Sequence, residues 1–338
     1  MDIATFLIHL GLFLLALTGF LLARYIYIHK KTEKKLVCPL KSDCGAVIHS
    51  DYSKFLGLPV ERVGMVYYIV MMLGHLAIIV FPSIGTPSYL FVLFLQSMIA
   101  FLFSLYLILI QAFALKKWCT WCLSSAFMCA TIFAMSYSLL SVPLSDLFAS
   151  HRTGFIILHM IAAVLGIGAA TFTDIFFFRF MKDGRLMQNE VDTMKIFSQV
   201  IWVALGIFLF SGTALFLPKS EELLASPKFV TKMIAVFVLI VNGTLLHFVV
   251  TPHLSEIPFN DGGAAINRHA LYLRKLSFAL GGISFSTWYF VFILALVKPV
   301  TLPLSTLLLV YGGLLICVII GSQIMERIFT KQLKIMHI

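Results

Sequence analysis

Four of the six cysteines in this chain form two close pairs. Cys38 and Cys44 lie in a hydrophilic segment, whereas Cys119 and Cys122 form a Cys-x-x-Cys motif where an apolar run begins. Paired thiols exchange electrons with other thiols through mixed disulfides. Because the second pair borders an apolar run, the two pairs together predict electron transfer between protein thiols and a lipid-soluble carrier.

The surroundings of the Cys-x-x-Cys motif favour reactive thiols. The start of a helix is the positive end of its dipole, which stabilises a thiolate at Cys119 or Cys122. Two lysines directly precede the motif and add positive charge. Trp118 and Trp121 give flat apolar surface, on which a quinone ring could pack or which could anchor the helix at the membrane boundary.

Other readings of these residues stay open. The two pairs could be static structural disulfides. A zinc site fits poorly, because five residues separate Cys38 from Cys44 and no histidine lies near the second pair, so we predict no metal. Cys129 and Cys317 fall inside apolar runs, where we expect small buried side chains. His75 lies mid-helix, where we expect burial with a hydrogen bond to backbone, although a quinone pocket would be within its reach.

The elements around these cysteines are membrane helices. The chain of 338 residues is 60% hydrophobic and 12% charged, with a mean hydropathy of +1.00. Its apolar runs are continuous rather than alternating, which favours helices over a barrel. We predict an all-α, polytopic membrane protein whose nine helices span residues 4–28, 64–82, 87–115, 121–142, 153–180, 196–217, 229–250, 276–297 and 303–325. The net charge of +10 is typical of basic loops against anionic lipid, and no nucleic-acid signature is present.

The helices divide into two groups. Residues 1–142 would form a four-helix domain and residues 153–338 a five-helix domain, separated by a loop at 143–152. If the helices alternate in direction, the loop after the first helix and the start of the fourth lie on one face, so all four paired cysteines meet there. Residues 45–56 place their apolar side chains on one broad side, which predicts a helix on the membrane surface.

The first domain resembles the vitamin K epoxide reductase family. The resemblance rests on these residues and spacings: Cys38-Pro, Cys44-x-x-Val47-x-x-Ser50-x-Tyr52, Gly57-x-Pro59, Gly64-x-x-Tyr67-Tyr68 and Cys119-x-x-Cys122-Leu-Ser-Ser. The order of the elements and the four-helix layout agree as well. The resemblance covers about the first two fifths of the chain.

This resemblance implies a membrane thiol:quinone oxidoreductase that supports disulfide formation. Cys122 would be the thiolate that faces a quinone inside the bundle, and Cys119 would be its resolving partner. Cys44 would attack the disulfide between them, and Cys38 would exchange with an external protein. Ser50 matches a serine that the family places close to this relay.

The resemblance also implies the cofactor and the partner. Residues 123–127 look like the microbial form of the family, which favours ubiquinone or menaquinone over vitamin K epoxide. Tyr67, Tyr68, Trp118 and Trp121 are the expected quinone contacts besides Cys122. Many microbial members fuse a thioredoxin-like domain to the bundle, and this chain shows none. The expected partner is therefore a separate thioredoxin-like protein of the DsbA type.

Two signals conflict on orientation in the cell (inner) membrane. The family mostly directs its cysteines away from the cytoplasm, where disulfides persist. In this chain, however, almost all Lys and Arg fall on the cysteine face, which the positive-inside rule assigns to the cytoplasm. The exceptions are Arg152, Lys219, Lys228, Lys232 and Lys298.

Residues 153–338 contain four polar residues inside apolar runs, namely His159, Asp174, Lys232 and His247. Such residues are costly in a bilayer and often functional. The segment resembles uncharacterised bacterial membrane families and, faintly, haem-binding protoporphyrinogen oxidases. A haem or second quinone site is one interpretation; the other is that Asp174 and His247 form a polar pair between helices. The alternative function is accordingly a redox-regulated transporter or sensor, with the main activity in this half.

Overall fold

The computed structural model describes residues 2–32, 38, 43–55, 57–181, 186–259, 267–297 and 302–336. Within these ranges, nine helices are long and apolar enough to cross a membrane, which confirms the predicted all-α, polytopic fold class. Three residues of the sequence patterns above lie outside the described residues, namely Pro39, Leu56 and Lys298.

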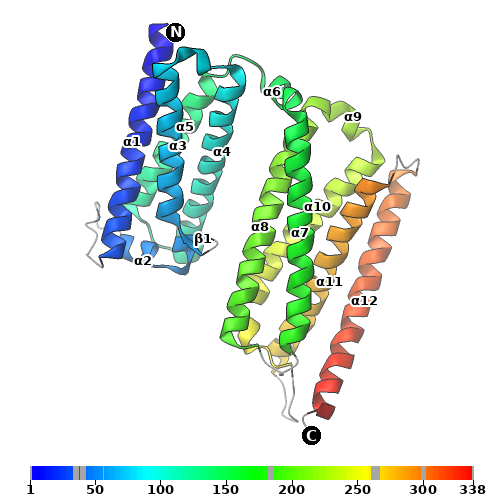
Figure 1. Ribbon diagram of the computed structural model, residues 1–338. Coiled ribbons are helices and arrows are strands. Elements are labelled where there is room, and N and C mark those ends of the chain that lie inside the picture. The colour runs from blue at the N-terminus through cyan, green and yellow to red at the C-terminus, as the bar shows by residue number, and fades with distance from the viewer. Residues whose placement is uncertain are drawn as a thin grey trace. The chain divides into compact units, whose positions relative to one another are not determined.

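The chain divides into two compact units, Met1–Leu147 and Phe148–Ile338. The membrane helices of the first unit are α1 (Ile3–Lys31), α3 (Val60–Val80), α4 (Pro87–Leu109) and α5 (Thr120–Ser138) (Figure 1). The helix α6 (Leu144–Ser150) follows them, within the segment that we expected to be a loop. The boundary between the units falls inside this helix.

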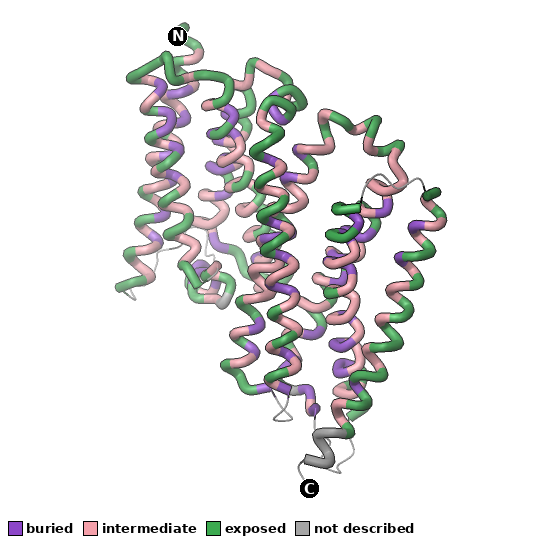
Figure 2. Tube along the Cα trace, turned by 45° about the vertical axis from the view of Figure 1, so that its right-hand side comes forward, coloured by how far each residue is buried: buried purple, intermediate pink, exposed green. Residues whose placement is uncertain are grey.

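The four helices of the first unit bury one apolar core. Helix α1 packs along α3 and α5, and α4 packs along α5. Leu12, Met71 and Ile132 have no exposed surface and come from three different helices. Large apolar residues on the outer sides of these helices are exposed, as expected where lipid rather than water surrounds the bundle (Figure 2).

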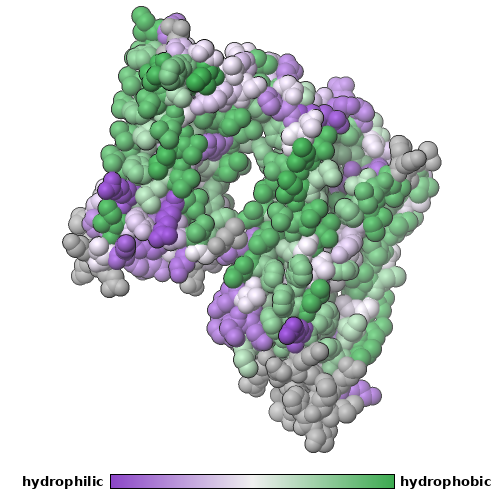
Figure 3. Space-filling model, in the orientation of Figure 1, coloured by the Kyte–Doolittle hydropathy of each residue, from purple (hydrophilic) through white to green (hydrophobic). Residues whose placement is uncertain are grey.

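Short elements cover one end of this bundle. They are α2 (Cys44–Ile48), a 3₁₀ turn (Asp51–Ser53) and a hairpin of β1 (Lys54–Phe55) with β2 (Leu58–Pro59). The surface helix predicted over 45–56 is therefore wrong beyond residue 48. Gly57, with φ of +79°, makes the turn of the hairpin that replaces it. Hydrophilic residues gather at this end, below an apolar middle zone (Figure 3).

The second unit contains five of the membrane helices: α7 (Arg152–Phe180), α8 (Gln188–Phe216), α10 (Pro227–Leu245), α11 (Arg268–Leu296) and α12 (Leu304–Met336). A short helix, α9 (Ser220–Leu224), precedes α10. A π-helical turn (Leu246–Val250) extends α10 at its C-terminal end. Helices α8 and α11 begin eight residues before the predicted starts at 196 and 276. Their first turns are polar, so hydropathy underestimates helices that continue beyond the hydrocarbon core.

Candidate redox site

The four paired cysteines meet at the end of the first unit that α2 covers. Cys44 begins α2, and Cys119 is the N-cap of α5. Both side chains have no exposed surface and lie in one apolar cluster, against which Cys38 and Cys122 also pack. The structure therefore brings together the two pairs that the helix count placed on one face.

The two pairs differ in how their sulfurs are bonded. Cys38 and Cys44 form a disulfide, whereas Cys119 and Cys122 are free thiols. Their sulfurs lie 2.7 Å apart, with the Cys122 thiol donating to Cys119 Sγ. The two pairs therefore lie in one cluster, as an exchange of a disulfide between them requires.

Hydrogen bonds single out Cys119 as the better thiolate. Its Sγ accepts from the backbone N–H of Cys122 at 3.3 Å as well as from the Cys122 thiol. The bond from the Cys122 thiol, aided by the N–H bonds at the helix start and opposed by burial, holds the pKa of the Cys119 thiol below its usual value. Cys122, which we expected to be the thiolate, acts instead as the donor in this arrangement.

Gln111 holds the motif in place, and sequence reasoning missed it. The residue lies in the π-helical turn Ile110–Leu115 that extends α4, and it is 3% exposed. Its Oε1 accepts the backbone N–H of Cys119 at 2.9 Å, and its carbonyl accepts the N–H of Lys117 at 3.1 Å. Between them Lys116 adopts a left-handed conformation with φ of 51°. The only sequence signal is an amide side chain within an apolar run.

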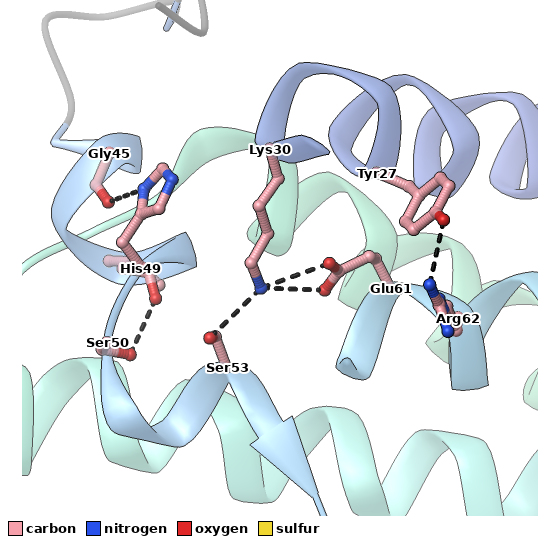
Figure 4. Close-up of polar contacts among 9 residues, drawn as sticks. Tyr27, Lys30, Gly45, His49, Ser50, Ser53, Glu61 and Arg62 are labelled. Carbon is pink, nitrogen blue, oxygen red and sulfur yellow. Dashed lines mark hydrogen bonds and ion pairs between the residues drawn. The ribbon is translucent and has the colours of Figure 1, made fainter. Parts of the chain in front are cut away.

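Two ion pairs lie at this end of the first unit. Asp43 accepts the N–H of Ala46 at the start of α2 and pairs with Lys117, two residues before Cys119. The hydrogen bond from Lys117 keeps the pKa of the Asp43 carboxyl below its usual value. Lys30, at the end of α1, lies 3.2 Å from Glu61 of α3 and donates to Ser53 Oγ at 3.2 Å (Figure 4).

Ser50 lies beside this cluster without a hydrogen bond to a cysteine in the described residues. Its hydroxyl donates to the carbonyl of Val47 at 2.7 Å, which closes the end of α2 (Figure 4). This hydrogen bond stabilises the C-terminal end of α2, the helix that begins with Cys44. Its expected part in the relay stays a prediction.

The expected quinone contacts occupy different environments. Trp118 is 48% exposed, while Trp121 packs edge-on against Tyr25 with ring centroids 5.6 Å apart. Tyr68 is 1% exposed, and its hydroxyl lies 2.9 Å from Ser125 Oγ and 3.5 Å from the Cys129 sulfur. Cys129 is thus buried, as predicted, although it takes part in a polar contact.

Tyr67 has a buried hydroxyl that has no hydrogen-bond partner among the described residues. Such a donor is costly unless a ligand accepts from it. A separate groove of about 860 Å³ runs between α1 and α5 and is lined by Tyr25 and Trp121, but neither Tyr67 nor Cys122 lines it. The groove therefore opens beside the motif rather than onto its sulfurs.

His75 corrects one expectation. It is 1% exposed, but its Nδ1 bonds with Nδ1 of His9 on α1 at 3.0 Å rather than with backbone. His9 lies near the start of α1 and His75 near the end of α3. The pair therefore lies at the end of the bundle opposite to the cysteines.

The polar residues of the second unit do not form the expected pair. In the described residues no hydrogen bond or ion pair joins Asp174 to His247, and Nδ1 of His247 is buried without a partner. His159 instead bonds to Ser211 at 2.9 Å. Cys317 is exposed on the side of α12, which corrects its predicted burial. No group of three His, Cys, Asp or Glu in the described ranges could hold a metal ion.

Comparison with known proteins gives one family match, which falls within the first unit. Residues 10–137 match the vitamin K epoxide reductase family. No curated protein and no solved structure matches the chain. The match confirms the resemblance drawn from the cysteines and their spacing, and with the nine apolar helices it shows an integral membrane protein with an oxidoreductase unit.

All residues of the candidate site fall within the matched range. The reductase-like unit, residues 1–147, contains both cysteine pairs, Gln111 and Tyr67. The second unit, residues 148–338, lies outside the match. The vitamin K epoxide reductase match therefore bears on the chemistry of the first unit alone.

Proposed function

We propose that this protein is a thiol:quinone oxidoreductase that regenerates disulfides in a separate thioredoxin-like protein. The observation that carries the proposal is the cluster in which Cys44 and Cys119 are both fully buried, with Cys38 and Cys122 packed against it. Two cysteine pairs gathered in one cluster favour direct exchange between the pairs over two independent structural disulfides.

Electrons enter at the loop pair. The partner's dithiol reduces the Cys38–Cys44 disulfide by thiolate attack through a mixed disulfide, and the partner leaves oxidised. Cys38 is half-buried whereas Cys44 is fully buried, so Cys38 is the sulfur that an external protein can reach. This supports Cys38 as the exchange site.

Electrons then pass to the motif pair. Cys44 attacks the Cys119–Cys122 disulfide, the loop disulfide re-forms, and Cys119 and Cys122 become thiols. The state of the structure, with Cys38–Cys44 oxidised and the motif reduced, corresponds to the product of this step. Hydrogen bonds to Cys119 Sγ favour it as the thiolate that closes the motif disulfide again.

The last step reduces the quinone. The Cys119–Cys122 dithiol gives two electrons and two protons to the quinone, which leaves as quinol while the motif disulfide forms. Flow in this direction is favoured because quinones accept two electrons at potentials above those of protein dithiols. About 30 mV of potential difference is worth about 1.4 kcal/mol in a two-electron couple. The partnerless hydroxyl of Tyr67 supports a buried acceptor such as a quinone carbonyl inside the bundle. Ubiquinone and menaquinone are the proposed acceptors.

We further propose that the cysteine end faces away from the cytoplasm in the cell membrane, as the family habit suggests. Labelling of Cys38 with an impermeant maleimide in intact cells, after mild reduction, tests this. Labelling only after lysis would assign the cysteine end to the cytoplasm, in agreement with the basic residues on that face.

The activity is tested with the purified full-length protein in lipid nanodiscs. A dithiol donor and a short-chain ubiquinone are added, and loss of quinone absorbance is followed. Cys122→Ser should abolish the turnover, whereas Cys317→Ser, which changes an exposed cysteine of the second unit, should leave it unchanged. Full turnover by Cys122→Ser would refute the proposal.

A further inference from the structure

A pocket of about 310 Å³ opens between the start of α11 and the end of α12 in the second unit. Its lining is mostly basic, with Arg274 and Lys275 from α11 and Arg327 and Lys331 from α12. The apolar run of α12 gives way to charge at Glu326 and Arg327, so the pocket lies at the charged end of this helix, as expected near a membrane interface. Nothing in the oxidoreductase chemistry of the first unit uses it.

A buried ion pair forms the floor of this pocket. Arg274 Nε lies 2.6 Å from Glu326 Oε1, and the two side chains are 5% and 3% exposed. Arg274 Nη1 also donates to the carbonyl of Pro258 at 3.1 Å. Burial of a charged pair is not in itself a reason for stability. Its effect here is to neutralise the charge of Arg274 beneath the other cations.

The mouth of the pocket keeps an excess of positive charge. Lys275 is half-buried, while Arg327 and Lys331 are exposed. Among the described residues no carboxylate pairs with these three cations, since Glu326 is engaged by Arg274. The main-chain carbonyl of Lys275 accepts from Gln323 Nε2 at 3.0 Å, which joins α11 to α12 at this level. Three cations around a formed pocket favour an anionic ligand.

An apolar stripe leads to the basic mouth. Ile320, Ile324 and Ile328 on α12 are 56%, 52% and 49% exposed. Their spacing of four residues places them in one row along the helix. Arg327 lies beside the end of this row, and Lys331 follows Ile328 on the same side after a little less than one turn. A ligand with a charged head and apolar chains would match both parts at once.

We propose that this pocket binds the phosphate group of an anionic phospholipid, with the acyl chains lying along the isoleucine stripe. Basic pockets between membrane helices, close to the interface, are suited to phosphate headgroups. Inorganic phosphate has the same charge chemistry but would leave the stripe unused. The continuity of stripe and mouth therefore favours the lipid.

Native mass spectrometry of the full-length protein in detergent tests the proposal. The protein is titrated with phosphatidylglycerol or phosphatidylcholine, and bound lipid is counted. Phosphatidylglycerol should bind more tightly, and Arg327→Gln with Lys331→Gln should weaken it by roughly tenfold or more. Lys195→Gln with Lys219→Gln removes the same charge from sites half-exposed and paired elsewhere, and should leave binding unchanged.

Two further measurements make the test decisive. A photoactivatable phosphatidylglycerol should crosslink to peptides of α11 and α12, and inorganic phosphate at millimolar concentration should not displace it. Three outcomes would overturn the proposal: equal binding of the two lipids, an equal loss of phosphatidylglycerol affinity in the pocket variant and the control variant, or displacement of the lipid by inorganic phosphate. Because the substituted side chains are exposed, loss of the fold does not confuse the result.

Discussion

The backbone N–H of Cys119 donates to Oε1 of Gln111 across 2.9 Å, in a place where both residues are buried. The bond joins the π-helical end of α4 to the N-cap of α5. It fixes where the Cys-x-x-Cys motif begins and thereby the side from which Cys44 meets it. Gln111 is a positioning residue, since it acts through Cys119 rather than on a substrate.

Gln111→Leu should slow electron transfer between the two cysteine pairs by about tenfold or more. The substitution leaves the buried N–H of Cys119 without an acceptor, at a cost of roughly 1–3 kcal/mol. The measurement is acid quenching after a pulse of dithiol, followed by alkylation and mass spectrometry of each pair. Gln111→Glu keeps an acceptor oxygen and should transfer faster than Gln111→Leu.

Ser97→Ala is the matched control for Gln111. Ser97 of α4 is likewise a buried polar residue, but among the described residues its hydroxyl bonds within its own helix alone, to Phe94 at 2.7 Å. Its removal should leave the transfer rate unchanged. A rate in Gln111→Leu equal to that of Ser97→Ala would show that the bond to Cys119 has no positioning role.

The pH dependence of Cys119 alkylation should show the effect of the hydrogen bond that the Cys122 thiol donates to Cys119. Because the Cys122 thiol lowers the pKa of Cys119, the thiolate persists at pH values where an ordinary thiol is protonated. Cys122→Ala removes this donor, so the pKa should rise and the alkylation profile should move to higher pH. Site-resolved mass spectrometry of the reduced protein measures the profile. Cys122→Ser keeps a hydroxyl donor and should stay close to the parent; an unchanged profile in Cys122→Ala would contradict the assignment.

Asp43 should affect the exchange rate more as the N-cap of α2 than through its ion pair with Lys117. Both side chains of the Asp43–Lys117 ion pair are half-exposed, and such pairs contribute little. Lys117→Gln should therefore change the exchange rate by no more than about fivefold. Asp43→Ala also removes the acceptor for Ala46 N–H at the start of α2 and should slow exchange further.

Acidification offers an independent check on Asp43. Its folded pKa lies below the usual value, so its ion pair is present at neutral pH and is lost only as the pH falls through that lowered pKa. Asp43→Asn should therefore differ from the parent at neutral pH and converge with it in acid. Divergence that grows in acid would contradict this interpretation.

His9 and His75 should show strong coupling in stability. Each imidazole is nearly fully buried, and each has the other as the partner of its Nδ1. Replacing one by Leu strands a polar ring inside the bundle, which should lower the free energy of unfolding by roughly 1–3 kcal/mol. The double variant should lose less than the sum of the two single variants. Denaturant unfolding of the parent, the two single variants and the double variant in detergent gives the double-mutant cycle. Additive losses of unfolding free energy would show that the rings do not interact.

The sequence predicts the fold class and the meeting of the two cysteine pairs because both follow from hydropathy and from helix alternation. It could not predict the hairpin after Ile48, since the apolar pattern of 45–56 fits a helix until Gly57 turns the chain. Nor could it predict Gln111 or the His9–His75 pair. These depend on which sides of separate helices face each other, and a single apolar run does not specify that.

Gly19 on α1 should tolerate no side chain because the ring of Tyr68 lies against it. A Cβ at this position would lie 2.2 Å from the Tyr68 ring, so Gly19→Ala should push the ring away from its contact with Ser125. Overpacking of this kind typically costs about 1–3 kcal/mol. Gly64→Ala is the control, because its nearest neighbour would be Ala23 Cβ at 4.0 Å. Thermal unfolding should therefore separate the two variants, and quinone turnover should fall in Gly19→Ala alone if the position of Tyr68 shapes the quinone pocket.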